Sequence, residues 1–259
     1  MNTKKIASTL FFICFLFFVG YFIFKKTPDC KEVIVEYTSE NPENRLLDES
    51  YVKKVIADIY PNIVGTSFRD LNLRTLENTL QKIPAVLETE AYRTQQGVLH
   101  IRMQSRQPLV RVMPLRGKDF FIDETGHLIP AHTSDRARVP IASGYIHFRY
   151  NEKTQDIKNI ADNKQIGDIY KLAKSIAKDT FWRAQIEQIY FTKDNKIELV
   201  PKVGKHIVML GTTDRYKNKL RNLKKMYIKV LQREGWNKYN YLNIEYKDQI
   251  VCTRNTKER

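Results

Sequence analysis

One short stretch of the chain concentrates the side chains that carry out acid–base and metal chemistry. Residues 119–132 read DFFIDETGHLIPAH. The candidate side chains in this stretch are Asp119, Asp123, Glu124, His127 and His132. Carboxylates near an imidazole are the groups of general acid–base catalysis, and the same donors bind zinc. The stretch therefore raises the question of whether the chain is an enzyme.

A reverse turn explains the same residues without any chemistry. The apolar runs FFI and HLIP flank Asp-Glu-Thr-Gly, in which Asp123 suits the start of a turn and Gly126 supplies the positive φ that closes it. His127 and His132 lie on either side of Pro130, so they do not share one helical face as zinc ligands often do. The chain has no G-x-S-x-G, Walker, H-E-x-x-H or G-x-G-x-x-G motif. We therefore predict a β-hairpin, with no catalytic residue, metal site or cofactor.

A long uncharged segment lies near the start of the chain. Residues 6–24 contain no charge, and 13 of these 19 residues are Phe, Ile, Leu or Val. At about 1.5 Å per residue they span roughly 28 Å, close to the thickness of a bilayer core. The segment is longer than the apolar part of a signal peptide and lacks a small-residue cleavage pattern. We predict a head at 1–5 and an uncleaved transmembrane helix at 6–24, whose orientation the flanking lysines leave open.

The positive charge is concentrated at the C-terminal end. The formal net charge is +15, and residues 202–259 hold 15 basic and 5 acidic residues, against 27 and 24 in residues 25–201. Charge alone leaves nucleic acid, anionic lipid and an acidic protein as possible partners. The cysteines, Cys14, Cys30 and Cys252, form no C-x-x-C pair, which argues against structural zinc. Their spacing leaves open whether Cys30 and Cys252 form a disulfide.

Residues 30–104 have the pattern of a small module. Alternating apolar residues in KEVIVEY predict a strand, and two helical stripes follow. Asp48 or Ser50 suits the N-cap of the first helix, and Pro61 suits its end. AVLETEAY and VLHIRM predict two strands joined by the turn RTQQG. The order strand–helix–helix–strand–strand leaves no room for a deep pocket, so we expect a binding module.

Residues 105–255 are predicted to form a β-rich domain with helices, which places the chain in the α+β class, with a tail at 256–259. A helical stripe over 163–178 precedes three strands, AQIEQIYFT, NKIELVP and KHIVMLG. A longer helix over 214–234 has the predicted core stripe Tyr216, Leu220, Leu223, Tyr227 and Val230. Its basic residues off that stripe include Lys217, Arg221, Lys224 and Lys225. YNYLNIEY and QIVCTR are predicted as the last two strands.

Four short segments, taken in order, resemble one known family. LHIRMQSRQPLVRV carries Arg106 and Pro108 as an Arg-x-Pro, FFIDETGHLIP has an Asp-Glu-x-Gly hairpin, and VPIASG (139–144) and YLNIEYKDQIVCTR follow. Together they are similar to the FtsQ/DivIB family of bacterial cell-division proteins over nearly the whole chain. The chain departs from that family at Ser105, where an acidic residue is usual, and in NIEY, which ends at Tyr246 where DLRY is common.

The resemblance implies a non-enzymatic scaffold at the division septum. It implies one span in the inner membrane, a cytoplasmic N-terminus and a periplasmic C-terminal part. Residues 30–104 would be a POTRA-like module that recruits the protein to the septum. Residues 105–255 would be a β-domain that binds FtsB-like and FtsL-like coiled-coil proteins among other septal-ring components. No nucleic acid or small-molecule substrate is expected.

The partner-binding residues are predicted at the C-terminal end. A last strand with no following sequence to cover it is an open edge, and in the family this strand accepts a partner strand. The basic helix is either solvated or adds charge complementarity to an acidic partner. The predicted residues are Tyr246, Gln249, Ile250, Val251, Cys252, Thr253, Arg254, Lys217, Arg221 and Lys224. A proline at Val251 is expected to abolish partner binding while the chain still inserts and folds.

Other functions fit parts of the pattern. One is a POTRA-type scaffold of another envelope assembly system. Another is a membrane-tethered hydrolase that uses Asp123, Glu124 and His127. Alanine at all three positions would inactivate an enzyme but would cost a scaffold little beyond turn stability. Nucleic-acid binding by the basic end is the weakest hypothesis, because that end lacks a recognisable motif of interleaved aromatic residues.

Overall fold

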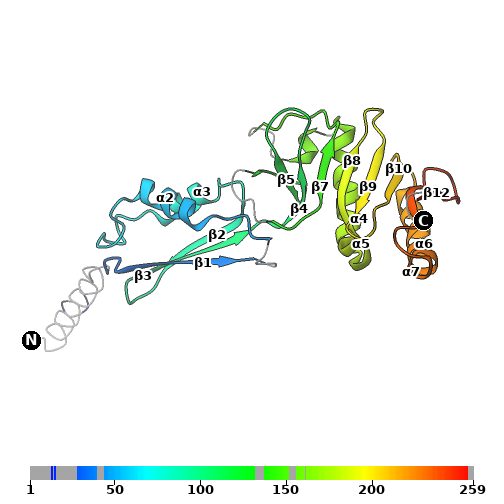
Figure 1. Ribbon diagram of the computed structural model, residues 1–259. Helices are drawn as coiled ribbons and strands as arrows, with labels where there is room; N and C mark the ends of the chain where they lie inside the picture. The colour runs from blue at the N-terminus through cyan, green and yellow to red at the C-terminus, as the bar shows by residue number, and fades with distance from the viewer. Residues whose placement is uncertain are drawn as a thin grey trace, which may run out of the picture.

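The computed structural model shows an elongated molecule with two sheets placed end to end (Figure 1). It describes residues 13, 15, 28–39, 44–131, 137–151, 156–160 and 162–255. The architecture is the predicted α+β class, with a small module followed by a β-rich domain. The predicted head at 1–5, the tail at 256–259 and His132 lie outside the described residues.

The predicted membrane span also falls largely outside that set. Only Ile13 and Phe15 of residues 6–24 are described. Within the described part of the chain, no helix is both long enough and apolar enough to cross a membrane.

The first module is a three-stranded sheet with two helices. Its strands are β1 (Glu32–Thr38), β2 (Val86–Arg93) and β3 (Val98–Ser105), and its helices are α2 (Glu49–Ile59) and α3 (Leu73–Leu80). β3 is the central strand, parallel to β1 and antiparallel to β2. This is the order of elements that the periodicity predicts.

Side-chain caps determine where the two helices begin. Asp48 is the N-cap of α2, since its Oδ1 accepts a hydrogen bond from the N–H of Ser50 at 2.8 Å. Asn72 caps α3 in the same way through the N–H of Thr75 at 3.0 Å. Such caps satisfy N–H groups that have no partner within the helix. Both helices bury their apolar sides against the sheet, where the fully buried residues of β3 are Leu99, Ile101 and Met103.

The second domain is a nine-stranded sheet with helices packed on one face. In spatial order its strands are β12 (Val251–Arg254), β11 (Tyr239–Asn243), β10 (Ile207–Gly211), β9 (Ile197–Pro201), β8 (Ile186–Phe191), β7 (Ile141–Gly144), β4 (Pro108–Val112), β5 (Phe120–Asp123) and β6 (Leu128–Pro130). Its helices are α4 (Lys164–Lys178), α5 (Thr180–Gln185), α6 (Tyr216–Met226) and α7 (Gln232–Glu234), with a 3-10 turn at Ile157–Ile160 and a π-helical segment at Tyr227–Leu231. The predicted three-strand meander is β8, β9 and β10, and it is confirmed.

One row of apolar side chains crosses this sheet on the face that the helices cover. The paired residues of the row are Cys252, Leu242, Val208, Leu199, Ile189, Ala142, Val112 and Phe120. Buried residues of the helices, such as Leu172, Trp182 and Leu223, belong to the same core. The row reaches β12 at Cys252, so the last described strand is attached to the core as well as to its neighbour β11.

The two modules share packed side chains at their junction. Phe121 and Ile129 point away from the helices of the second domain and belong to the buried cluster of the first module. Arg106 lies between β3 and β4. Its Nη1 donates to Oδ2 of Asp123 at 2.9 Å, and its Nε donates to the carbonyl of Val86 at 3.1 Å. The modules are therefore joined by a common core and an ion pair.

The last long helical segment departs from its predicted stripe. Leu220 and Tyr227 are buried as predicted, but the next buried residue is Leu231, and Val230 is only partly buried. The π-helical segment explains the shift, because its turn is wider than an α-helical turn and moves the apolar face one residue along the sequence. Tyr216, predicted in the core, is partly buried at the start of the segment.

Candidate functional site

The turn after β5 is held by its own side chains. Oδ1 of Asp123 accepts hydrogen bonds from the N–H of Thr125 at 2.8 Å, the hydroxyl of Thr125 at 2.7 Å and the N–H of His127 at 2.7 Å. Gly126 has φ of 91°, and a Cβ there would lie 2.6 Å from Cγ2 of Ile157. The predicted hairpin is confirmed, with β5 antiparallel to β6.

The other described acid–base groups of this stretch have different surroundings. Asp119 forms an ion pair with Arg111 at 3.0 Å, whereas Glu124 is exposed. Burial lowers the pKa of His127 below its ordinary value. Across the residues with described positions, no group of three His, Cys, Asp or Glu side chains could hold a metal ion. The hairpin accounts for the pattern that suggested chemistry.

The predicted partner-binding strand lies at one end of the nine-stranded sheet (Figure 1). β12 pairs with β11 on one side, with Val251 opposite Asn243 and Cys252 opposite Leu242. Of the strands that the structure describes, none pairs with the other side of β12. An edge of this kind exposes backbone N–H and C=O groups that another strand can use.

One hydrogen bond beside β12 gives the direction of its backbone groups. The N–H of Asn255 donates to the carbonyl of Lys238, just before β11, at 2.9 Å. Backbone groups of successive residues in a strand alternate between its two sides. Those of Val251 and Thr253 therefore point towards β11 and hold the hairpin together.

The open side of β12 presents the backbone groups of Cys252 and Arg254. The side chain of Cys252 packs partly on the core, whereas that of Arg254 is exposed. This register corrects the expectation for a proline at Val251. That proline would remove a hydrogen bond of the hairpin rather than one available to a partner. Arg254 is the position where the outward N–H can be removed with little loss of packing.

The remaining predicted residues of this end lie mostly in the loop before β12. β11 ends at Asn243 and β12 begins at Val251, so both strands are shorter than predicted. Of the predicted partner-binding residues, those thereby moved from strand to loop are Tyr246, Gln249 and Ile250. Asp248, with φ of 56°, is in the left-handed conformation and interrupts the extended chain there. The exposed residues of the predicted set are Tyr246, Gln249, Val251, Thr253 and Arg254, whereas Ile250 and Cys252 are partly buried.

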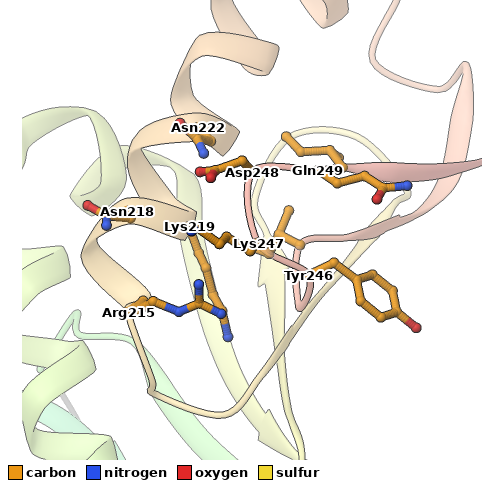
Figure 2. A pocket seen from close by; sticks show the side chains of 10 residues that line it. Arg215, Asn218, Lys219, Asn222, Tyr246, Lys247, Asp248 and Gln249 are labelled. Carbon is orange, nitrogen blue, oxygen red and sulfur yellow. The ribbon is translucent and has the colours of Figure 1, made fainter.

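This loop and α6 line a small, partly open cavity of about 130 Å³ (Figure 2). The labelled lining residues are Arg215, Asn218, Lys219, Asn222, Tyr246, Lys247, Asp248 and Gln249. The ring of Tyr246 points away from the cavity and is 56% exposed. The side of the loop that carries Tyr246 is thus accessible to a partner.

Lys219, a buried lysine that is not among the residues predicted from the sequence, lines the cavity. Lys219 is 8% exposed, and its Nζ donates to the carbonyls of Leu210 at 2.9 Å and Thr212 at 3.0 Å. Burial lowers the pKa of Lys219 below its ordinary value. Its position four residues before the stripe residue Leu223 was the available signal, since residues four apart share a helix face.

The three predicted basic residues of α6 fall into two groups. Nζ of Lys224 lies 3.0 Å from both carboxylate oxygens of Asp179 and 5.0 Å from the ring centre of Phe181. Asp179 is the N-cap of α5, so this ion pair ties α6 to α5. Lys217 and Arg221 are exposed and have no ion pair with any residue placed by the structure. The charge of Lys224 is therefore already paired within the domain.

Comparison with models of protein families assigns both domains of the chain to known families. Residues 107–253, more than half of it, match the model described as FtsQ/DivIB, C-terminal related, and residues 28–104 match a POTRA-like domain. The chain belongs to the FtsQ/DivIB family. A search of curated proteins returned no match. The two matched domains are those of a family of cell-division scaffolds that are generally non-enzymatic.

Two of the segments that carry the FtsQ/DivIB resemblance meet at the junction of these domains. Arg106, from the Arg-x-Pro segment, is the residue that pairs with Asp123 of the hairpin. The carboxylate of Asp123 is 2% exposed, and its two oxygens bind Arg106 and the backbone of the turn. The two cysteines that the structure describes, Cys30 and Cys252, are free thiols and do not form a disulfide with each other.

Proposed function

We propose that the chain is a non-enzymatic scaffold of the divisome that binds a partner strand along β12. The observation that carries this proposal is the open edge of the nine-stranded sheet, where the backbone groups of Cys252 and Arg254 face away from β11. Strand addition at such an edge gives affinity through main-chain hydrogen bonds, and neighbouring side chains give specificity. Tyr246 and Thr253 are two of the exposed side chains near this edge and are proposed for that role.

The partners proposed for this edge are FtsB-like and FtsL-like coiled-coil proteins, through which the scaffold links septal-ring assembly to septal wall synthesis. The POTRA-like module, taken as residues 30–104, recruits the protein to the septum, and the β-domain, taken as 105–255, binds the partners. The two matched family domains support this division of labour. The junction core supports a fixed spacing between the two binding surfaces.

The same proposal places the chain in the inner membrane at the division septum. Residues 6–24 form its single span, residues 1–5 are cytoplasmic and the two domains are periplasmic. The length and lack of charge of that segment support the span. A scaffold role without catalysis is supported by the way Asp123 is committed to the turn and to Arg106.

A pair of substitutions at Arg254 tests strand addition. Arg254→Ala removes an exposed side chain but keeps the outward N–H, whereas Arg254→Pro also removes that donor. Proline is tolerated on an edge strand when its missing N–H faces away from the sheet. One lost hydrogen bond of about 1 kcal/mol, together with the clash between the proline ring and an incoming strand, lowers affinity at least about tenfold.

The measurement is recovery of the coiled-coil partners with the tagged full chain from solubilised membranes. We expect Arg254→Ala to recover both partners like the wild type and Arg254→Pro to lose them, with unchanged tryptophan fluorescence in both variants. Equal recovery by the two variants would overturn strand addition. Failure of the wild-type chain to recover either partner would favour a scaffold of another envelope assembly system.

A further inference from the structure

Five basic side chains form a row along the exposed side of the last helical segment. They are Lys217, Arg221, Lys225, Lys229 and Arg233, spaced four residues apart. All five are exposed, and none forms an ion pair or a side-chain hydrogen bond with any residue whose position the structure describes. At about 1.5 Å per residue the row is roughly 24 Å long. We call these five residues the basic row.

The π-helical segment reduces the winding of the basic row around the helix axis. In an α-helix, residues four apart drift around the axis by about 40° per step, so a long row of this spacing would wind away. The wider turn at Tyr227–Leu231 opposes that drift. The same turn that buries Leu231 in place of Val230 therefore keeps Lys229 and Arg233 on the solvent side. π-helical turns of this kind occur frequently at functional sites.

The basic row is unfavourable for the isolated helix. Like charges four residues apart destabilise a helix by about 0.2–0.5 kcal/mol per pair, and the row contains consecutive pairs along its whole length. The two acidic residues of this segment are engaged elsewhere. Asp214 accepts a hydrogen bond from the hydroxyl of Thr212, and Glu234 forms an ion pair with Lys238. The row is left without a counter-charge from its own segment.

We propose that the basic row is a docking surface for an acidic helix of a protein partner. Carboxylates four residues apart on such a helix repeat every 6 Å or so, like the row itself, so the two can pair along their length. Ile228, between Lys225 and Lys229 in the sequence, is 46% exposed and offers an apolar contact within the charged surface. A core of apolar contact inside a charged rim suits a protein partner.

The environment of the segment argues against a lipid surface as the occupant. A helix that lies on a membrane turns its apolar face towards the lipid. Here the apolar face, which includes Leu220, Leu223 and Leu231, is buried in the core of the domain. Only the charged side remains for an external contact, and α6 and α7 lie at the end of the molecule away from the sheet and helices of the first module (Figure 1).

This inference rests on the proposed scaffold function and adds a second contact of different chemistry. β12 offers backbone hydrogen bonds, whereas the basic row offers charge. α6 and the loop before β12 line the same cavity, which brings the two surfaces close together (Figure 2). One partner that contains both a helix and an extended segment can therefore contact both surfaces.

The test uses a synthetic helical peptide with glutamate at every fourth position and a matched peptide with glutamine there. Binding of the fluorescent peptides to the full chain in detergent micelles would be measured by anisotropy at low and high salt. The row variant is Lys225→Glu/Lys229→Glu. Its matched control is Lys53→Glu/Lys54→Glu, which makes the same change of charge at two exposed lysines of α2.

We expect the wild type and the α2 control to bind the glutamate peptide, and the row variant to bind it at least about tenfold more weakly. High salt and the glutamine peptide should both weaken binding. Equal binding by the row variant, or no preference for glutamate, would overturn the proposal. Stronger binding to vesicles of phosphatidylglycerol than to the peptide, lost in the row variant, would overturn it in favour of a lipid surface.

Arg254→Pro separates this proposal from strand addition. It should bind the glutamate peptide like the wild type, because it leaves the basic row unchanged. Loss of peptide binding in the row variant with normal partner recovery through β12 would support the row as a separate surface. Failure of the peptide experiment alone would overturn the row and leave strand addition standing.

Discussion

Replacing Asp123 with alanine would remove the carboxylate that joins the two domains. Its side chain is 2% exposed, and its Oδ2 lies 2.9 Å from Nη1 of Arg106. Deleting one member of a buried ion pair costs about 3–5 kcal/mol, because the other charge is left without a partner. Arg106 retains some solvent contact, with 16% of its side chain exposed, and still donates to Val86. We therefore expect a loss of about 3–4 kcal/mol in the free energy of unfolding.

The assay is urea unfolding of the full chain in detergent micelles, followed by two signals. Trp182 and Trp236 are the only tryptophans and both lie in the β-domain, so fluorescence reports that domain alone. Far-ultraviolet circular dichroism reports both domains. Because Phe121 and Ile129 complete the core of the first module, both signals should report the same loss in the free energy of unfolding.

Glu124→Ala is the matched control, since Glu124 is the next residue in the turn and is exposed. A surface change of this kind should alter the free energy of unfolding by less than about 0.5 kcal/mol. A loss below about 1 kcal/mol for Asp123→Ala would refute the ion pair as the link between the domains. A loss seen by fluorescence alone would refute the shared core.

Two further predictions concern single positions in the β-domain. His206 is buried, and its Nε2 lies 2.6 Å from the hydroxyl of Tyr227. Burial lowers the pKa of His206 below 6.5. Its contribution to stability is therefore complete above pH 6.5 and is lost as the pH falls below that value, where the unfolded chain binds the proton more tightly. His206→Phe should therefore flatten the dependence of the unfolding free energy on pH in urea titrations above and below pH 6.5, and an unchanged slope would contradict this assignment. Gly144→Ala would place a Cβ 2.3 Å from the carbonyl oxygen of Phe191, whereas Gly65→Ala, at a similar positive φ, meets nothing within 4 Å. Gly65→Ala should cost about 1–2 kcal/mol and Gly144→Ala at least about 2 kcal/mol more in the same titration, and equal losses would contradict the close approach.

The elements of the first module could be predicted because their signals are local. The N-cap at Asp48 and the alternation in β3 depend only on residues a few positions apart. The hairpin at Asp123–Gly126 is local in the same sense. The ion pair between Asp123 and Arg106 is not, because the two residues meet only after both sheets have formed.

The edge position of β12 could be predicted from chain order, but its register could not. A bulge between Tyr239 and Tyr241 shifts the pairing of β11 with β12, so the outward direction at Arg254 depends on the folded hairpin. Lys224 and Lys217 look alike on a helix, and only the approach of Asp179 distinguishes them. The regular spacing of Tyr216, Leu220, Leu223, Tyr227 and Val230 predicts an uninterrupted α-helix, so the π-helical turn could not be predicted from it.

The most direct test of the scaffold account is cell length after depletion of the protein in its host, with complementing copies that carry the wild-type sequence, Arg254→Ala or Arg254→Pro. The account predicts filaments with segregated chromosomes and no septa after depletion. It predicts rescue by the wild type and by Arg254→Ala, no rescue by Arg254→Pro, and a mid-cell band for a fluorescent fusion of the wild type. Normal division after depletion, with the fusion spread evenly around the membrane, would contradict it.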